Sequence, residues 1–380
     1  MFKNILDLIG KTPIVRLNKI EKFFNLKNEL YAKIEYFNPG GSIKDRVGVY
    51  MLKSAENENK VNKDTIIIEP TSGNTGVGIA LYALSKGNKL IFTMPSKISM
   101  EKEFLLKAYG AFVVRTPTEV TPDSPNSYYK IAEILRNLVW KRNKKLEINE
   151  IKEIVDYVQK LIDQNKIDKL KKILNEKTEP NIYAYIPNQY YNKNNPKTHY
   201  ETTAREIWEQ FNGKIDFIFS GMGTGGTITG ISSFMKEKCE IKIIGVDPVG
   251  SIYNLVKKGV KLEEALKHAH SYFVEGIGED IIPETIDLEA IDDIVVVNDQ
   301  MSFSMTRFLS KNEGILVGGS SGAALYGTIK YLKENNINNK KVLVIFPDSG
   351  RNYLTKVFND DWLIEHGFET NDEKILEVLK

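Results

Sequence analysis

The chain has 380 residues, of which 42% are apolar and 27% charged, and its formal net charge is +2. This composition is ordinary for a globular protein with room for two domains, and so small a net charge provides no broad basic field for binding nucleic acid. The single cysteine, Cys239, excludes an internal disulfide and any zinc site built from several cysteines.

Short β-rich runs alternate with helical stretches from about residue 63 onward. In the first half we expect strands over 65–68, 89–94 and 111–115 and helices over 75–85 and 99–109. The second half repeats the rhythm, with strands over 215–219, 241–246, 294–297 and 342–346 and helices over 227–237, 299–312 and 320–333. Such alternation is typical of parallel sheets covered by helices, which bind ligands at the carboxyl ends of their strands.

The segment 138–179 differs, because it is rich in lysine and glutamate and contains no glycine or proline. Its apolar residues recur at the spacing of one or two amphipathic helices; they are Ile151, Ile154, Val155, Val158, Leu161 and Ile162. These helices either lay their apolar side on the body of the protein or contact a partner, such as the second copy of a dimer.

A glycine-rich loop, 220-SGMGTGGT-227, joins the strand expected over 215–219 to the next helix. Glycines let backbone N–H groups face a ligand, and a helix start favours an anion such as phosphate. The hydroxyls of Thr224 and Thr227 can add donors. The loop lacks the closing Gly-Lys-Ser/Thr of a nucleotide P-loop and the spacing of a dinucleotide fingerprint. Taken alone, it can also be no more than a tight turn.

Lys44 follows Pro39-Gly40-Gly41 and Ser42, a candidate helix cap, so it is expected in the first turn of a helix. There an amine can bond an aldehyde and then act as a base, although a solvated lysine near a cap would show the same pattern. A third loop, 71-TSGNTG-76, also precedes a helix and offers hydroxyls, an amide and free N–H groups to a carboxylate. A simple helix-capping turn is the alternative for this loop.

Together these segments resemble the pyridoxal-phosphate (PLP) enzymes of fold type II, which have the tryptophan-synthase-like fold, and within them the cysteine synthase and cystathionine β-synthase family. The similarity spans roughly 5–362 except the insertion near 138–180, and it is closest to the catalytic core of the cystathionine β-synthase group. The segments that carry this closer resemblance are 111-AFVVRTPTEVTPDSP-125, 194-NNPKTHYETTAREI-207, 236-KEKCEIKIIGVDPVGSI-252, 274-VEGIGEDIIP-283 and 347-PDSGRNYLTKVFNDDW-362.

The resemblance implies an α/β fold of two domains, each a mostly parallel sheet covered by helices, with PLP in the cleft between them. The expected parts are an N-terminal domain over 1–140, of which about 13–35 can pack on the other domain, a helical insertion over 141–180, a C-terminal domain over 181–365 and a tail over 366–380. Since few residues precede Lys11-Thr12-Pro13 and few follow Trp362, we expect neither haem nor regulatory domains that bind S-adenosylmethionine.

The resemblance also implies roles for matching positions. Lys44 matches the Schiff-base lysine and base, Asn74 the partner of the cofactor's ring hydroxyl, and Ser320 the partner of its pyridine nitrogen. The phosphate cup matches Gly223, Thr224, Gly225, Gly226 and Thr227, and the expected substrate-binding positions are Thr71, Ser72, Gly73, Thr75, Gln189, Gly276 and Glu279. A serine at the ring nitrogen makes the cofactor a milder electron sink, which favours β-elimination and replacement. No metal is expected.

The implied activity is β-replacement at an L-amino acid, in which L-serine and L-homocysteine give L-cystathionine and water. Glu279 departs from the animal and yeast members of the group, which carry tyrosine there, and Gly221 is more like cysteine synthases. The second substrate therefore stays open. The alternatives are cysteine synthesis from O-acetyl-L-serine and sulfide, and a cysteine-consuming reaction that releases hydrogen sulfide. A non-catalytic protein of this fold that binds partners is a third interpretation.

No stretch of the sequence approaches the ~20 apolar residues that a membrane helix needs, and its beginning lacks the pattern of a secretory signal. We expect a cytoplasmic homodimer that acts on small molecules, with neither a membrane nor a nucleic acid as partner.

Overall fold

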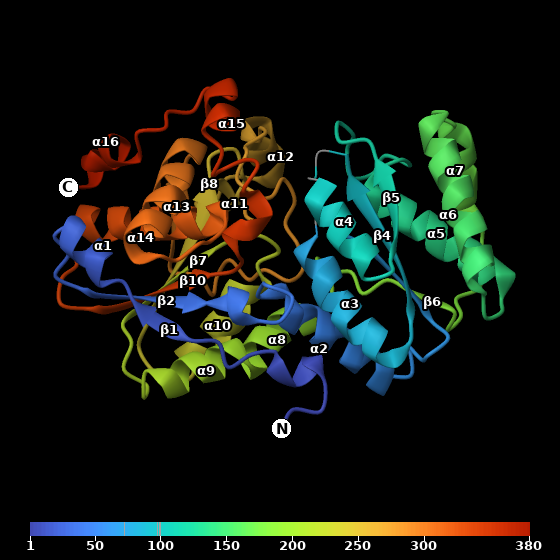
Figure 1. Cartoon of the computed structure of the whole chain (residues 1–380), viewed down its shortest axis with the longest axis horizontal. Coiled ribbons are helices and arrows are strands. Elements are labelled where there is room, and N and C mark those ends of the chain that lie inside the picture. Colours follow the sequence, from blue (N-terminus) through green and yellow to red (C-terminus); the bar gives the residue numbers. More distant parts are fainter. Residues whose placement is uncertain (72, 97, 99) are drawn as a thin grey trace. The chain divides into compact units, whose positions relative to one another are not determined.

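The structure is a computed structural model of the chain and describes residues 1–71, 73–96, 98 and 100–380. The described residues form two compact units, and Figure 1 labels most of their helices and strands. The first unit comprises Met1–Asp7 and Lys44–Asn194, and the second comprises Leu8–Ile43 and Asn195–Lys380. The α/β class expected from the sequence is confirmed, because each unit contains a mostly parallel sheet. The domain boundaries drawn from the sequence remain predictions.

The sheet of the first unit is parallel and has the strand order β5-β4-β3-β6. β3 is buried along its whole length, and its isoleucines suit a strand that is covered on both faces. It ends at Pro70, so the polar loop that starts at Thr71 lies at the carboxyl edge of the sheet. The elements of this unit are β3 (Ile66–Pro70), β4 (Lys89–Pro95), β5 (Phe112–Thr116), β6 (Ala184–Tyr185), α2 (Lys44–Asn57), α3 (Asn74–Lys86), α4 (Met100–Ala108), α5 (Tyr128–Arg142), α6 (Ile148–Asp163) and α7 (Ile167–Asn175).

The sheet of the second unit has the order β1-β2-β10-β7-β8-β9, and its neighbouring strands are parallel except for the pair β1 and β2. Its strands are β1 (Ile14–Arg16), β2 (Glu29–Ile34), β7 (Phe217–Gly221), β8 (Lys242–Pro248), β9 (Asp293–Val297) and β10 (Lys341–Phe346). Its helices are α1 (Asn18–Phe23), α9 (Thr203–Gln210), α10 (Gly226–Lys236), α11 (Tyr253–Lys257), α12 (Leu262–Ala265), α13 (Asp299–Glu313), α14 (Gly319–Glu334), α15 (Asp360–Glu365) and α16 (Asp372–Leu376), and α8 (Asn194–Glu201) begins at the boundary. Short 3-10 turns are η1 (Ile5–Leu8), η2 (Glu35–Phe37), η3 (Leu266–His268), η4 (Gly350–Tyr353) and η5 (Glu377–Leu379).

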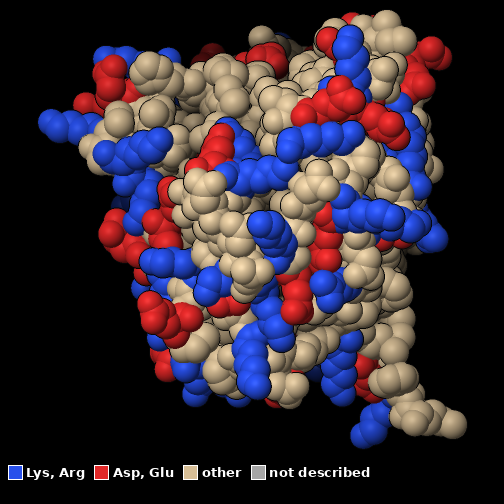
Figure 2. Space-filling view, turned by 90° about the vertical axis from the view of Figure 1, so that its left-hand side faces the viewer, with Lys and Arg blue, Asp and Glu red and all other residues tan. Residues whose placement is uncertain are grey.

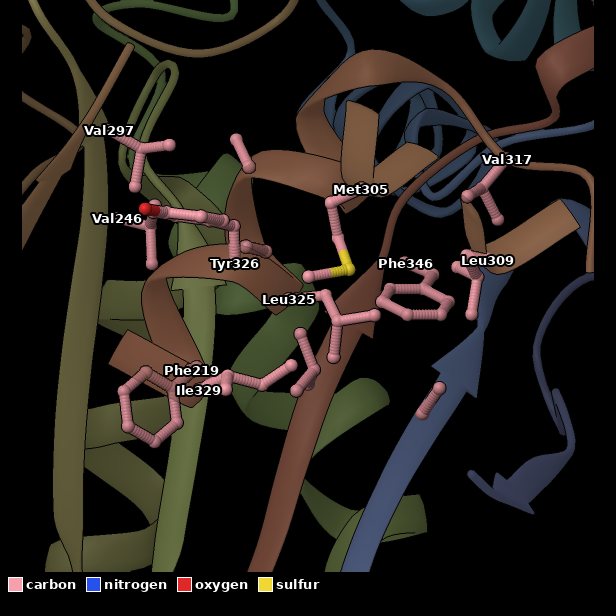
Figure 3. Packing of buried hydrophobic residues seen from close by; sticks show 14 of the residues in the cluster. Phe219, Val246, Val297, Met305, Leu309, Val317, Leu325, Tyr326, Ile329 and Phe346 are labelled. Atoms are coloured by element: carbon pink, nitrogen blue, oxygen red, sulfur yellow. The ribbon is translucent and has the colours of Figure 1, made fainter. Parts of the chain in front are cut away.

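One hydrophobic core of the second unit lies between its sheet and the helices α13 and α14 (Figure 3), and a second one includes residues of α9 and α10. Phe346 of β10 lies beside Leu309 of α13 and near Leu325 of α14, and Phe219 of β7 lies beside Ile329 of α14. Burial of these side chains stabilises the unit through the hydrophobic effect. It also holds α14 against β7, β8, β9 and β10.

The surface of the described residues carries mixed charges on the face drawn in Figure 2, where Lys and Arg are interspersed with Asp and Glu. A mixture of this kind agrees with the net charge of +2. This face therefore offers no extended basic area of the kind that binds nucleic acid.

The helices α6 and α7 bury their apolar side within the first unit, in one cluster with residues of β3, β4, β5 and α5. Ile151 and Val158 are fully buried there. Gln159 of α6 also satisfies the backbone of the edge strand β5, because its amide nitrogen donates to the Arg115 carbonyl at 3.2 Å and its amide oxygen accepts from the Arg115 N–H at 3.0 Å. The predicted amphipathic helices are thus confirmed, and their apolar stripe packs on the body of the protein and covers a sheet edge.

Candidate active site

Lys44 is the first residue of α2, which confirms the prediction that it lies in the first turn of a helix. α2 packs on α3 through a close approach at Gly48 and Gly78. A Cβ atom on Gly78 would overlap the Lys44 carbonyl oxygen and would lie 2.8 Å from the Cα atom of Asp45. Glycine at position 78 therefore allows the Lys44 backbone to lie against α3, which begins at Asn74.

The polar loop between β3 and α3 is folded by Thr71. The Thr71 hydroxyl accepts hydrogen bonds from the N–H groups of Gly73 at 3.1 Å and Gly76 at 3.2 Å. Gly73 has φ +129°, a conformation that side chains rarely adopt, so glycine is required there. Asn74 follows directly as the first residue of α3. Ser72, also predicted as a substrate-binding residue, lies outside the described residues.

Gln189 joins this loop through its side chain, because its amide oxygen accepts a hydrogen bond of 2.6 Å from the Thr75 hydroxyl. The turn that carries Gln189 is held by Glu69, whose carboxylate oxygens accept from the N–H groups of Asn188 at 2.8 Å and Gln189 at 3.1 Å. Glu69 is fully buried, and this burial raises the pKa of its carboxyl to about 8. Sequence reasoning missed Glu69, which directly precedes Pro70 and the loop.

Glu69→Gln is expected to raise the KM for the amino-acid substrate about fivefold to tenfold with little change in kcat. The amide nitrogen of glutamine would face one of the two backbone N–H donors, so the turn would lose about one hydrogen bond and Gln189 would shift. Steady-state kinetics measure the change, and Glu153→Gln, which alters an exposed glutamate of α6, is the control. An unchanged KM would show that Glu69 does not position Gln189.

The same variant should alter how stability depends on pH. The folded chain binds the Glu69 proton more tightly than the unfolded chain does, because the pKa of Glu69 is raised to about 8 on folding. The protonated Glu69 therefore adds to the free energy of unfolding in full at a pH below the ordinary glutamate pKa, and this contribution is lost as the pH rises through about 8. Relative to Glu69→Gln, the unchanged chain should therefore lose free energy of unfolding over that interval. Urea unfolding at several pH values measures the difference, and parallel curves would contradict the assignment.

The glycine-rich loop of the second unit connects β7 to α10. Gly225 is the N-cap of α10 with φ +79°, and as a glycine it has no side chain that could cap the first amides of the helix. Gly223 lies so near the loop 274–278 that a Cβ atom on it would be 2.6 Å from the Gly276 carbonyl oxygen. The first turn of α10 thus leaves N–H groups for an anion, in a cradle that side chains would fill, and this arrangement fits a phosphate group.

Ser320 lies at the start of α14, at the same edge of the sheet as this loop. It is 4% exposed, and a Cβ atom on Gly221, the last residue of β7, would be 3.9 Å from the Ser320 carbonyl oxygen. The Gly278 N–H donates to the Met222 carbonyl at 2.7 Å. The structure therefore brings Ser320, the residues Gly223–Thr227 and the segment around Gly276 together.

Glu279 directly follows Gly276-Ile277-Gly278, and hydrogen bonds of its backbone N–H and carbonyl groups hold it in place. Its N–H donates to the Ser251 hydroxyl at 3.1 Å, and its carbonyl accepts from the Ile252 N–H at 3.1 Å. Burial, followed by the negative charges of Glu279 and Asp247, raises the pKa of the Tyr272 hydroxyl well above its usual value. Glu279 thus contributes negative charge to this part of the second unit.

A second layer of polar residues, which sequence reasoning did not identify, surrounds the glycine-rich loop. The Tyr253 hydroxyl donates to the Gly223 carbonyl at 2.7 Å, and the Thr285 hydroxyl donates to the Thr224 carbonyl at 2.5 Å. The Asn195 amide nitrogen donates to the Thr224 hydroxyl at 2.9 Å. Asn195 belongs to 194–207, one of the segments that carry the family resemblance, and Tyr253 directly follows another, 236–252.

The predicted site residues form one group in each unit. Lys44, Thr71, Gly73, Asn74, Thr75 and Gln189 belong to the first unit, and Gly223–Thr227, Gly276, Glu279 and Ser320 belong to the second. Among the described residues no group of three His, Cys, Asp or Glu side chains is placed to hold a metal ion. Within the same residues, no helix combines the length and the apolar character needed to cross a membrane.

Proteins similar to this chain are found both by sequence and by structure. Residues 5–348 match the family described as pyridoxal-phosphate dependent enzyme. The chain is 42% identical over 366 residues to cystathionine beta-synthase of Mus musculus, which covers 96% of this chain and 57% of the mouse protein. The chain spans 57 to 65% of the length of the curated relatives that it matches.

Two solved structures are similar along almost their whole length. A hydrogen sulfide-producing enzyme from Fusobacterium nucleatum shares 36% identity with a TM-score of 0.71, covering 93% of this chain and 98% of that one. The O-acetylserine dependent cystathionine beta-synthase from Helicobacter pylori shares 32% identity with a TM-score of 0.70, covering 94% and 98%.

Proposed function

The chain belongs to the family of pyridoxal-phosphate-dependent enzymes, and on this premise we propose that it catalyses β-replacement at an L-amino acid, with L-serine and L-homocysteine giving L-cystathionine and water. Two groups of residues, described by themselves in each unit, support the proposal. In the first unit, a lysine at a helix start packs against the helix that follows a folded polar loop, and in the second a glycine-rich helix start lies near a buried serine.

Each residue has a defined task in this proposal. Lys44 would hold the cofactor through its amine, and the same amine, held within reach of the substrate, would act as the base that removes the proton from the substrate Cα. Thr71, Gly73, Thr75 and Gln189 bind the substrate carboxylate, and Ser72, which lies outside the described residues, is proposed to bind it with them. Pyridoxal phosphate supplies the electron-withdrawing ring that stabilises the negative charge left at Cα.

The remaining contacts orient the cofactor. Gly223–Thr227 hold its phosphate through backbone N–H groups and hydroxyls. Asn74 would hold the ring hydroxyl, and Ser320 would hold the ring nitrogen. Because a serine hydroxyl is neutral, Ser320 has no charge with which to keep that nitrogen protonated, which favours replacement over reactions that need a long-lived carbanion.

The leaving group and the thiol are the part of the proposal that has rivals. The structure from Helicobacter pylori is described as O-acetylserine dependent, and the one from Fusobacterium nucleatum as hydrogen sulfide-producing. The second candidates are cysteine synthesis from O-acetyl-L-serine and sulfide, which shares only the donor named for the Helicobacter pylori structure, and consumption of cysteine with release of hydrogen sulfide, the product named for the Fusobacterium nucleatum structure. A panel of these donors, each offered homocysteine or sulfide, separates the candidates when the products are identified by mass spectrometry.

Glu279→Ala is expected to lower the preference for homocysteine over sulfide, measured as the ratio of the two kcat/KM values. A carboxylate there attracts the ammonium group of homocysteine and repels a small anion such as hydrosulfide, and charge-assisted contacts are typically worth ~1.5–3 kcal/mol. Glu284→Ala, which removes an exposed acid five residues further along the chain, serves as the control. A ratio that Glu279→Ala leaves unchanged would exclude Glu279 from the choice of thiol.

The proposal also includes the cytoplasmic homodimer that is expected from the sequence. Light scattering of the purified chain measures its mass in solution, and fractionation of cells that produce the chain measures its location.

A further inference from the structure

His199 is a fully buried residue of α8 that no step of the proposed reaction uses. Its Nδ1 atom lies 2.9 Å from the Thr203 hydroxyl, and its Nε2 atom lies 3.2 Å from the hydroxyl of Thr227 in the glycine-rich loop. α8 can approach α10 this closely because position 230 is glycine, where a Cβ atom would be 2.8 Å from the Cβ atom of His199. The contact between His199 and Thr227 therefore depends on the close packing of α8 against α10 within the second unit.

The direction of these hydrogen bonds follows from the anion. A phosphate group only accepts hydrogen bonds, and a threonine hydroxyl has one proton to donate. If Thr227 donates that proton to the phosphate, its oxygen must accept from His199, so Nε2 carries a proton. In a neutral imidazole the other nitrogen is then an acceptor, and Thr203 donates to it.

Thr224, the other threonine of the loop, also has a hydrogen-bond donor of α8 beside its hydroxyl. The side-chain nitrogen of Asn195, also on α8, lies 2.9 Å from the Thr224 hydroxyl. An amide nitrogen only donates, so the Thr224 oxygen accepts and its own proton stays available. In this arrangement, the hydroxyl oxygens of both Thr224 and Thr227 accept a hydrogen bond from a side chain of α8, which leaves both hydroxyl protons available to the phosphate.

We propose that His199 and Thr203 are positioning residues for the cofactor phosphate. They form a relay in which the Thr203 hydroxyl donates to Nδ1 of His199 and Nε2–H of His199 donates to Thr227, whose proton is thereby directed toward the phosphate. The relay rests on the phosphate role given to Gly223–Thr227 in the proposed function. Neither His199 nor Thr203 needs to touch the cofactor.

The relay predicts a loss of affinity that depends on the phosphate group. Cofactor-free Thr203→Val chain should bind pyridoxal phosphate about tenfold more weakly than the unchanged chain. It should bind pyridoxal, which lacks the phosphate, with unchanged affinity. Thr203→Ser keeps the hydroxyl and should restore binding of pyridoxal phosphate. Equilibrium dialysis with both compounds measures these affinities.

The outcomes separate the relay from the proposed function. If the unchanged chain binds pyridoxal and pyridoxal phosphate equally well, the phosphate role of Gly223–Thr227 is wrong and the relay falls with it. If the unchanged chain prefers pyridoxal phosphate and Thr203→Val preserves that preference in full, the relay alone is overturned.

A second measurement needs no variant at position 203, so it decides the question even if Thr203→Val fails to fold. NMR spectra of isotope-labelled histidine in the cofactor-loaded chain report which ring nitrogen is protonated, and replacement of His268, His270 and His366 identifies the signals of His199. The relay predicts a neutral ring protonated at Nε2. A ring protonated at Nδ1, or at both nitrogens, would overturn it.

Discussion

Lys44→Ala is expected to lower the rate of β-replacement by ~10³-fold or more, because one side chain both bonds the cofactor and serves as the base. The purified unchanged chain should be yellow with bound cofactor, and the variant should lose that absorbance band. Its melting temperature without cofactor should change little, since Lys44 is a partly buried residue at the start of α2.

The matched control for this variant is Lys53→Ala, which removes an exposed lysine from the same helix. It should keep both the absorbance band and the rate. Near-normal turnover in Lys44→Ala would exclude the assigned mechanism, whatever the control does.

Gly78→Ala is expected to lower both stability and turnover. The added methyl group would overlap the Lys44 carbonyl oxygen and approach the Asp45 Cα atom to 2.8 Å, so α2 and α3 must move apart. Overpacking of this kind typically costs about 1–3 kcal/mol of unfolding free energy. Because the displaced backbone is that of Lys44, kcat should fall even at temperatures where the variant stays folded.

Gly327→Ala in α14 is the matched control. Its Cβ atom would be 3.1 Å from the methyl groups of Val246, and these side-chain atoms can move slightly, whereas the backbone atoms near Gly78 cannot. Urea unfolding and steady-state kinetics of both variants measure the two effects. A Gly78→Ala chain with unchanged stability and kcat would show that the Gly78 contact does not hold Lys44 in place.

The sequence predicted the elements that alternate in a regular way, because buried parallel strands are marked by short β-branched runs and the helices between them by periodicity. The first strands of the second unit did not follow that pattern. β1 has three residues and pairs antiparallel with β2, and β2 joins β10 from the far end of the chain. A pairing across some three hundred residues has no local signal.

In the site, too, the features formed by one continuous stretch of sequence could be predicted, and the contacts between distant residues could not. The loops 71–76 and 223–227 and the helix start at Lys44 were predicted because each is a continuous stretch with its own turn chemistry. The residues that support these loops were not predicted, because their contacts are distant in sequence. Glu69 contacts residues 119 and 120 positions away, and His199 contacts Thr227, which is 28 positions away. Only the folded chain shows that these polar side chains face a loop rather than solvent.

The central claim is that this chain joins the carbon skeleton of L-serine to a thiol with Lys44 as the base. The most direct measurement incubates the purified chain, loaded with pyridoxal phosphate, with carbon-labelled L-serine and unlabelled L-homocysteine, and identifies the products by mass spectrometry. We expect L-cystathionine that carries every labelled carbon of serine, formed by the unchanged chain and not by Lys44→Ala. Absence of any labelled thioether from the unchanged chain, with O-acetyl-L-serine and with cysteine as well as with serine, would contradict the claim.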